Sequence, residues 1–128
     1  MIKSKFIIIL FMTIKISHGA VYDLPVDGQD VIGSISSVTS KYEDTLVDIA
    51  RRHGLGYLEI IQANPDVNPW LPGEGKEIIL PNKFILPPGP RKGLVLNLAE
   101  YRMYYYPEAS LGETPKVHTF PMSIGRIN

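Results

Sequence analysis

Few residues of this 128-residue chain have catalytic potential, since it contains three histidines and no cysteine. Without cysteine, these residues cannot form disulfides, thiolate metal sites or a thiol nucleophile. No serine has a base, an orienting group and an oxyanion donor arranged near it by spacing, so a serine nucleophile is not expected. His118 has no second histidine nearby to form a metal pair. We therefore expect no catalytic residue, no metal site and no cofactor.

His53 has a structural interpretation. It falls in the last turn of a predicted helix, where a cation interacts favourably with the helix dipole. The composition is that of a globular protein, with 45% hydrophobic and 20% charged residues. Thirteen basic side chains balance thirteen acidic ones. The chain thus has no positive field for binding phosphates, and nucleic acid is not an expected partner.

Residues 1–19 have the three parts of a secretory signal peptide: early lysines, an apolar run and small residues before a cleavage point. The apolar run, about nine residues, is too short for a membrane span of roughly 20. We expect cleavage after Gly19, export, and no membrane span in the mature chain. Cleavage would leave ten basic and thirteen acidic side chains, because it removes three lysines and no acid.

The predicted folded part begins with a lead-in at residues 20–33. Pro25 and Gly28 discourage regular structure, so residues 21–29 are expected to be irregular. A short strand is predicted over residues 31–39, where apolar and polar side chains alternate from the third residue onward.

Two short helices are predicted next. Asp44 is the expected N-cap of the first helix and Gly54 its C-terminal stop. The second helix is expected to end at Asn64, because Pro65 disfavours helical backbone in the residue before it. A strand at residues 77–81 completes the order strand, helix, helix, strand. The two helices would cover one face of a two-stranded antiparallel sheet.

A Pro-rich segment at residues 88–92 is expected to be a stiff linker. Three further strands are predicted within residues 94–98, 101–106 and 116–124. The four tyrosines of the middle strand are interpreted as sheet-packing residues. Three short strands bury little apolar area. This second unit therefore needs a partner or a further part of the fold.

The segment from Val38 to Leu86 resembles a LysM module, a small domain that binds peptidoglycan and chitin. The resemblance rests on Glu43-Asp44-Thr45-Leu46, Ile49-Ala50 with Gly54, Asn64-Pro65, and Leu71-Pro72-Gly73. Glu43 and Glu74 depart from the family pattern, which has glycine and glutamine there. The resemblance implies a βααβ module at residues 34–87.

LysM modules bind glycan between the loop before the first helix and the loop after the second. The site residues implied, with the tryptophan of the second loop, are Glu43, Asp44, Thr45, Leu46, Asn64, Pro65, Trp70 and Leu71. N-acetylated sugars carry amides and an apolar methyl, which an amide side chain and apolar walls could match. Alternatives stay open: Asp44 and Thr45 as helix-start residues, Asn64 as a helix stop, and Trp70 as a plug against the module.

Residues 93–106 and 119–126 resemble the opening of a YkuD-type L,D-transpeptidase catalytic domain. The order of signal peptide, LysM module and this domain is that of the ErfK/YbiS/YcfS/YnhG group. Such enzymes cross-link peptidoglycan stem peptides, or attach a lipoprotein to them, through an acyl-enzyme on cysteine. The family's catalytic motifs lie downstream of the Ile-Gly-Arg strand, and this chain ends at Asn128. No catalytic residue is therefore carried over.

The expected fold class is α+β: a LysM-like βααβ module followed, at residues 93–128, by the first β-strands of an incomplete, mostly-β catalytic domain. The expected function is that of the N-terminal fragment of a periplasmic, cell-wall-associated L,D-transpeptidase. The expected partners are peptidoglycan glycan strands and, for the complete enzyme, an envelope lipoprotein. Two alternatives stay open: a freestanding LysM protein that binds the wall, and an interaction module whose open β-edge recruits another chain.

Overall fold

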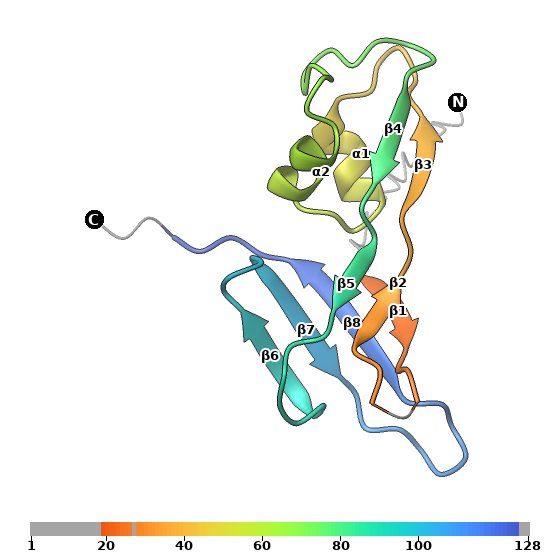
Figure 1. The fold of residues 1–128 in the computed structure, drawn as a ribbon, viewed down its shortest axis with the longest axis vertical. Helices are drawn as coiled ribbons and strands as arrows, with labels where there is room; N and C mark the ends of the chain where they lie inside the picture. Colours follow the sequence, from red (N-terminus) through yellow and green to blue (C-terminus); the bar gives the residue numbers. More distant parts are fainter. Residues whose placement is uncertain (1–18, 27, 126–128) are drawn as a thin grey trace, which may run out of the picture.

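The computed structural model describes residues 19–26 and 28–125, which form helices and antiparallel strands (Figure 1). The predicted signal peptide, apart from its last residue, lies outside the described residues. In chain order, the elements are β1 (Ala20–Asp23), β2 (Val31–Gly33), β3 (Ser36–Thr39), α1 (Leu46–Arg52), α2 (Tyr57–Ala63), β4 (Glu77–Leu80), β5 (Lys83–Ile85), β6 (Gly93–Asn97), β7 (Arg102–Tyr106) and β8 (Lys116–Pro121). This mixed fold agrees with the expected class.

The two helices and the β3–β4 pair form one unit, called here the helical unit (Figure 1). Leu46, Ile49 and Ala50 lie on one face of α1 because their spacing matches the helical period, and all three are buried. Ile60 from α2 and Ile78 from β4 are fully buried with them. The predicted order of strand, helix, helix and strand is present. Assignment of this unit to the LysM family remains a proposal.

The strand predicted over residues 31–39 is two strands. β2 pairs with β5, a strand that was not predicted, whereas β3 pairs with β4. The break falls after Gly33, which has a φ of 71°. A Cβ atom there would lie 1.9 Å from the carbonyl oxygen of Asn82, so the close approach of the two chains requires glycine.

A four-stranded antiparallel sheet with the order β1-β8-β7-β6 forms the second unit, below the helical unit in Figure 1. The irregular backbone predicted for residues 21–29 is wrong at its start, because β1 pairs with β8 from Ala20↔Thr119 to Asp23↔Lys116. The partner strand is far away in sequence, so local composition carried no sign of the pairing. Tyr22 of β1 also packs edge-on against the Phe84 ring, with centroids 6.2 Å apart.

The tyrosines near β7 are divided between the two faces of this sheet. Tyr104 and Tyr106 are buried against the rest of the protein, as predicted, whereas Tyr101 and Tyr105 are partly exposed. Tyr101 lies in the β6–β7 turn with a φ of 51°. Burial raises the pKa of the Tyr104 hydroxyl above its ordinary value.

Arg102 of β7 joins the sheet to the helical unit. Its fully buried guanidinium donates to both carboxylate oxygens of Glu59 in α2, at 2.9 Å from Nε and 2.5 Å from Nη2. It also donates to the Thr119 hydroxyl and lies 4.0 Å from the Phe84 ring centroid. The two units therefore share a bidentate ion pair. It remains a prediction that residues 88–92 are a linker between two domains.

Candidate functional site

The two loops predicted to bind glycan lie side by side. The backbone N–H of Leu46, at the start of α1, donates to the carbonyl of Pro69 in the loop after α2, with an N···O distance of 2.8 Å. One contact thus joins two segments that are separate in sequence. The structure brings the two predicted loops together. Some of their side chains are buried and hydrogen-bonded within the fold, and others are exposed to solvent.

The N-cap of α1 is Thr45, not Asp44 as predicted. The Thr45 hydroxyl accepts from the Asp48 N–H at 3.1 Å. Asp44 is buried, and its carboxylate accepts from the Lys41 N–H and from the Arg52 guanidinium, each at 2.8 Å. The capping prediction is therefore wrong by one residue, because the Asp44 carboxylate is turned toward its own loop and the far end of the helix. Leu46 is a core residue.

The Lys41 N–H stabilises the Asp44 carboxylate and, with the Arg52 guanidinium, lowers the pKa of this carboxyl below its ordinary value of 3.8. Burial acts in the opposite direction and is outweighed. The folded state therefore favours the ionised form. The resulting stability is present above the unfolded-state pKa and is lost as the pH falls through the folded-state pKa.

We expect the Asp44→Asn variant to be less stable than the parent protein at neutral pH. The difference should stay constant from about pH 7 to pH 5 and shrink below about pH 4, because the Asp44 carboxyl of the unfolded parent protein then binds a proton at a higher pH than that of the folded protein. Urea unfolding of both proteins across this pH range measures it, with Asp66→Asn, an exposed carboxylate, as the matched control. A difference that does not change with pH would contradict the assignment.

Asn64 is buried between α2 and β4. Its Nδ2 donates to the carbonyls of Ile60 and Ile79, and its Oδ1 accepts from the Ile79 N–H, at 2.8–2.9 Å. The residue ends α2, as predicted. These three bonds give the side chain a structural role, which was one of the two alternatives open from the sequence.

The exposed members of the predicted site are Glu43, Pro65, Trp70 and Leu71. Trp70 and Leu71 are 63% and 77% exposed. The Oδ1 atom of Asn68 accepts from the backbone N–H groups of both residues, at 3.0 and 3.1 Å. Asn68 therefore fixes the turn that presents these two apolar side chains to solvent. Trp70 is not a buried plug.

Tyr57 joins this surface from the first turn of α2. Its ring centroid lies 6.3 Å from that of Trp70, at an interplanar angle of 31°. Tyr57 falls within the second predicted helix, yet its side chain is 42% exposed. We call Tyr57, Trp70 and Leu71 the aromatic surface. The sequence has an aromatic residue, Tyr57, directly after Gly56. It gives no sign that Tyr57 contacts Trp70, which is thirteen positions away.

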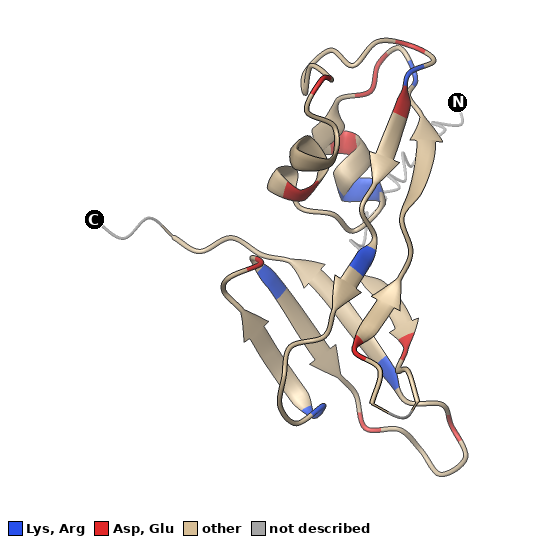
Figure 2. Cartoon of the chain, viewed as in Figure 1, with Lys and Arg blue, Asp and Glu red and all other residues tan. Residues whose placement is uncertain are grey.

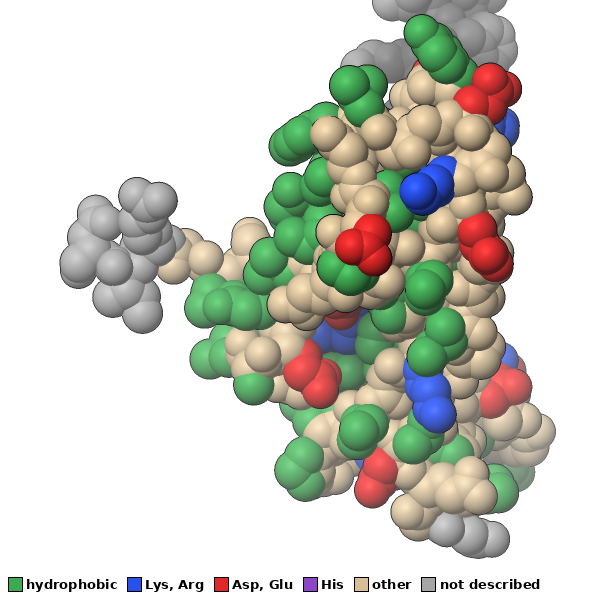
Figure 3. Space-filling view, turned by 45° about the horizontal axis from the view of Figure 1, so that its top comes forward, with side chains coloured by type: hydrophobic (Ala, Val, Ile, Leu, Met, Phe, Trp, Pro, Cys, Tyr) green, Lys and Arg blue, Asp and Glu red, His purple; other side chains and the backbone are tan. Residues whose placement is uncertain are grey.

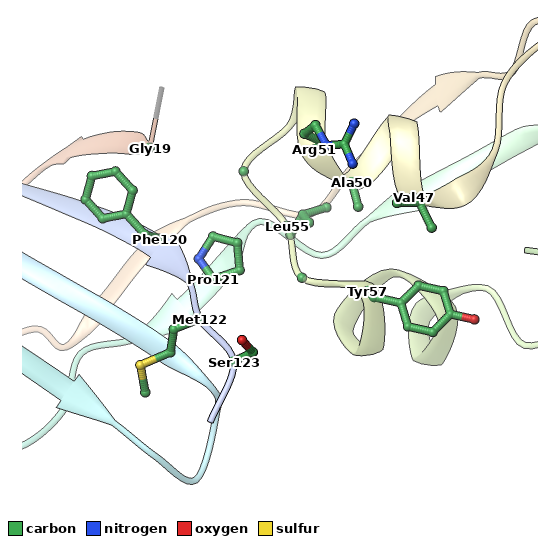
Figure 4. Close-up of a pocket in the computed structure, with 12 residues that line it drawn as sticks. Gly19, Val47, Ala50, Arg51, Leu55, Tyr57, Phe120, Pro121, Met122 and Ser123 are labelled. Carbon is green, nitrogen blue, oxygen red and sulfur yellow. The ribbon is translucent and has the colours of Figure 1, made fainter. Parts of the chain in front are cut away.

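A cavity of about 330 Å³ lies between the α1–α2 turn and the end of β8. Figure 4 shows Leu55 and Tyr57 on the helical side of this space, and Pro121, Met122 and Ser123 on the β8 side. Tyr57 thus lines this cavity as well as contacting Trp70. The aromatic surface and the junction of the two units are continuous through one side chain.

Charged residues are dispersed along the chain in both units (Figure 2). In residues 19–26 and 28–125, no three His, Cys, Asp or Glu side chains are grouped so as to hold a metal. Within the same ranges, no helix combines the length and the apolar character needed to cross a membrane.

The fold and the site define an α+β protein with an aromatic surface on its helical unit. By sequence, the chain is similar to L,D-transpeptidases over most of its length. It is 35% identical over 107 residues to the probable L,D-transpeptidase YcfS of Escherichia coli K12, covering 83% of this chain and 32% of the relative. For the probable L,D-transpeptidase ErfK/SrfK of Salmonella typhimurium LT2, identity is 34% over 121 residues, 91% of this chain and 38% of the relative.

The probable L,D-transpeptidase YbiS of Escherichia coli K12 is 34% identical over 108 residues, 83% of this chain and 34% of the relative. These matches confirm the resemblance to L,D-transpeptidases and fit a part of that family. The chain spans about a third of the length of these curated relatives. No protein-family model matches the chain.

Proposed function

We propose that this chain binds the glycan strands of peptidoglycan through the aromatic surface, as the wall-binding part of a periplasmic L,D-transpeptidase. The observation that carries the proposal is the pair of exposed rings, Tyr57 and Trp70, beside a turn held by Asn68. Two further findings support it: the LysM-like motifs in the loops before α1 and after α2, and the similarity to L,D-transpeptidases.

The chemistry of the aromatic surface suits N-acetylated sugars. Sugar rings and acetyl methyl groups present apolar faces, and burial of apolar area contributes about 25 cal/mol per Å². Tryptophan and tyrosine offer large apolar faces at low conformational cost, each with one polar group that can remain hydrogen-bonded. The exposed carboxylate of Glu43 lies before α1, where it can accept hydroxyl or amide hydrogens.

The activity of the whole protein is also a proposal. Transpeptidation through an acyl-enzyme needs a cysteine thiolate, and the 128 residues contain none. The role proposed for these residues is therefore binding, while catalysis and any lipoprotein acceptor belong to the complete enzyme. A freestanding wall-binding protein is the second candidate. It is favoured by the same exposed rings and differs only in lacking transpeptidase activity.

Replacement of Trp70 by alanine is expected to weaken binding to purified peptidoglycan sacculi by at least about tenfold, or roughly 1.4 kcal/mol. The change removes the larger ring of the aromatic surface and leaves the hydrogen bonds of the turn in place, because Asn68 bonds the backbone. Co-sedimentation with increasing amounts of sacculi measures the affinity. Tyr105→Ala is the control, since Tyr105 has the same partial exposure as Tyr57 but lies on β7.

Two results would remove this proposal. The first is failure of the parent protein to co-sediment with sacculi while it remains folded. The second is equal binding by Trp70→Ala and the parent protein, which would place any glycan contact elsewhere on the chain.

A further inference from the structure

A larger cavity, of about 690 Å³, lies where α2 meets the β6–β7 turn and the segment after β8. We call it the junction cleft. The lining residues that matter here are Tyr57 and Glu59 of α2, Glu100 and Tyr101 of the turn, and Met122 and Ile124 after β8. Its volume lies within the range of small-molecule sites, and three separate segments of the chain build it.

The junction cleft continues the aromatic surface. Tyr57 lines the cleft and packs on Trp70, so the two sites share one ring. Tyr101, on the opposite wall, is 41% exposed, nearly the same as Tyr57. The space-filling view shows hydrophobic side chains gathered along one side of the molecule, over the helical unit and on toward the sheet (Figure 3). An elongated ligand could therefore contact rings in both places.

The charges of the cleft select among ligands. Glu59 is neutralised by the buried Arg102, with which it forms two hydrogen bonds. The exposed Glu100 accepts one hydrogen bond, from the Tyr104 hydroxyl at 3.3 Å, and gives the cleft a net negative charge. An acidic ligand such as a peptide stem rich in carboxylates would be repelled. Hydroxyl and amide N–H donors are favoured, and neutral N-acetylated sugars carry both.

The walls of the cleft are held in place before any ligand binds. The Arg102–Glu59 pair ties α2 to β7, and the Met122 N–H donates to the Tyr101 carbonyl at 2.8 Å. Preformed walls lower the ordering cost of binding. Tyr101 also has a φ of 51°, a backbone conformation that is rare for tyrosine.

We propose that the junction cleft is a second glycan subsite, in which a neutral oligosaccharide of N-acetylglucosamine continues from Trp70 across Tyr57 to Tyr101. This inference rests on the proposed glycan binding, because the aromatic surface supplies the first subsite. It adds that binding depends on glycan length, and that the sheet contributes a wall of the site.

The test uses a trisaccharide and a hexasaccharide of N-acetylglucosamine, titrated calorimetrically into the full chain. A longer sugar gains up to about fourfold statistically by offering more registers to a short site. We expect the hexasaccharide to bind at least about tenfold more tightly than the trisaccharide. Tyr101→Asn should reduce that ratio to the statistical value and leave trisaccharide affinity unchanged. Asparagine tolerates the positive φ of this position.

Ile124→Ser changes the wall that the segment after β8 contributes, and it should have the same effect as Tyr101→Asn. This second variant keeps the inference testable if Tyr101→Asn does not fold. Trp70→Ala should weaken both sugars, and Tyr105→Ala should change neither. Trisaccharide binding that depends on Trp70, without a length effect beyond fourfold, would overturn the subsite and keep the proposed function. A length effect that survives both cleft substitutions would also overturn it. Absence of binding by both sugars would overturn the subsite, and co-sedimentation with sacculi would then decide the proposed function separately.

Discussion

Replacement of Arg102 by alanine is expected to lower the free energy of unfolding by about 3 kcal/mol, at the lower end of the range for breaking a buried ion pair. The guanidinium is fully buried and bonds Glu59, the Gly54 carbonyl and the Thr119 hydroxyl. Its removal leaves these acceptors without their donor and empties the space over Phe84. The lower end applies because the Glu59 side chain is 24% exposed and is partly solvated by water.

Urea unfolding measures this loss. The matched control is Arg91→Ala, because Arg91 also pairs with a carboxylate, that of Asp30, and neither side chain of this pair is fully buried: Arg91 is 26% exposed and Asp30 62%. A surface pair of this kind contributes less than about 1 kcal/mol. The double variant Arg102→Met with Glu59→Leu should recover much of the lost stability, because it removes both charges together. Equal effects of Arg102→Ala and Arg91→Ala would show that the buried pair does not join the two units.

Replacement of Asn64 by alanine is expected to destabilise the protein by about 3 kcal/mol. The side chain makes three hydrogen bonds that hold the end of α2 against β4. Each buried partner left unsatisfied costs about 1–3 kcal/mol, and the bonds to Ile79 cannot be replaced from within the helix. The effect should be large for a residue that the sequence assigned either to glycan binding or to the end of a helix.

Urea unfolding of Asn64→Ala and of the control Gln62→Ala measures the difference, since Gln62 is an exposed residue of the same helix. Surface substitutions of that kind stay within about 0.5 kcal/mol. Trisaccharide affinity, measured under conditions where each variant is folded, separates the two roles considered for Asn64. A structural residue leaves the affinity unchanged. A tenfold loss of affinity with unchanged stability would instead make Asn64 a ligand residue.

The helices were predictable because their determinants are local. Apolar residues of α1 recur at helical spacing, and Gly54 follows its C-cap with a φ of 65°. Asn64 ends α2 before proline, as expected. The error at the first cap was one residue, since Asp44 and Thr45 are both good capping residues. Their roles differ because the Asp44 carboxylate accepts from the Lys41 N–H and from Arg52, whereas the Thr45 hydroxyl accepts from the Asp48 N–H.

The candidate site was partly predictable in the same sense. Its two loops followed from the LysM-like motifs, and their contact between Leu46 and Pro69 is present. The motifs did not distinguish buried members from exposed ones. Asp44 and Asn64 face inward, and Trp70 faces solvent, because each side chain direction depends on partners elsewhere in the fold.

By itself, the sequence determined the α+β class, the order of the helices, the meander of β6, β7 and β8, and the relationship to L,D-transpeptidases. These features depend on side-chain periodicity, on caps and turns within a few residues, and on motifs read in order. The tertiary structure decided the pairing of β1 with β8, the joining of the units by Arg102 and Glu59, and the position of Tyr57 between Trp70 and the junction cleft. The ion pair between Asp23 and Lys116 joins residues 93 positions apart. Such contacts have no local signal, because their energy is gained only when distant segments meet in the folded chain.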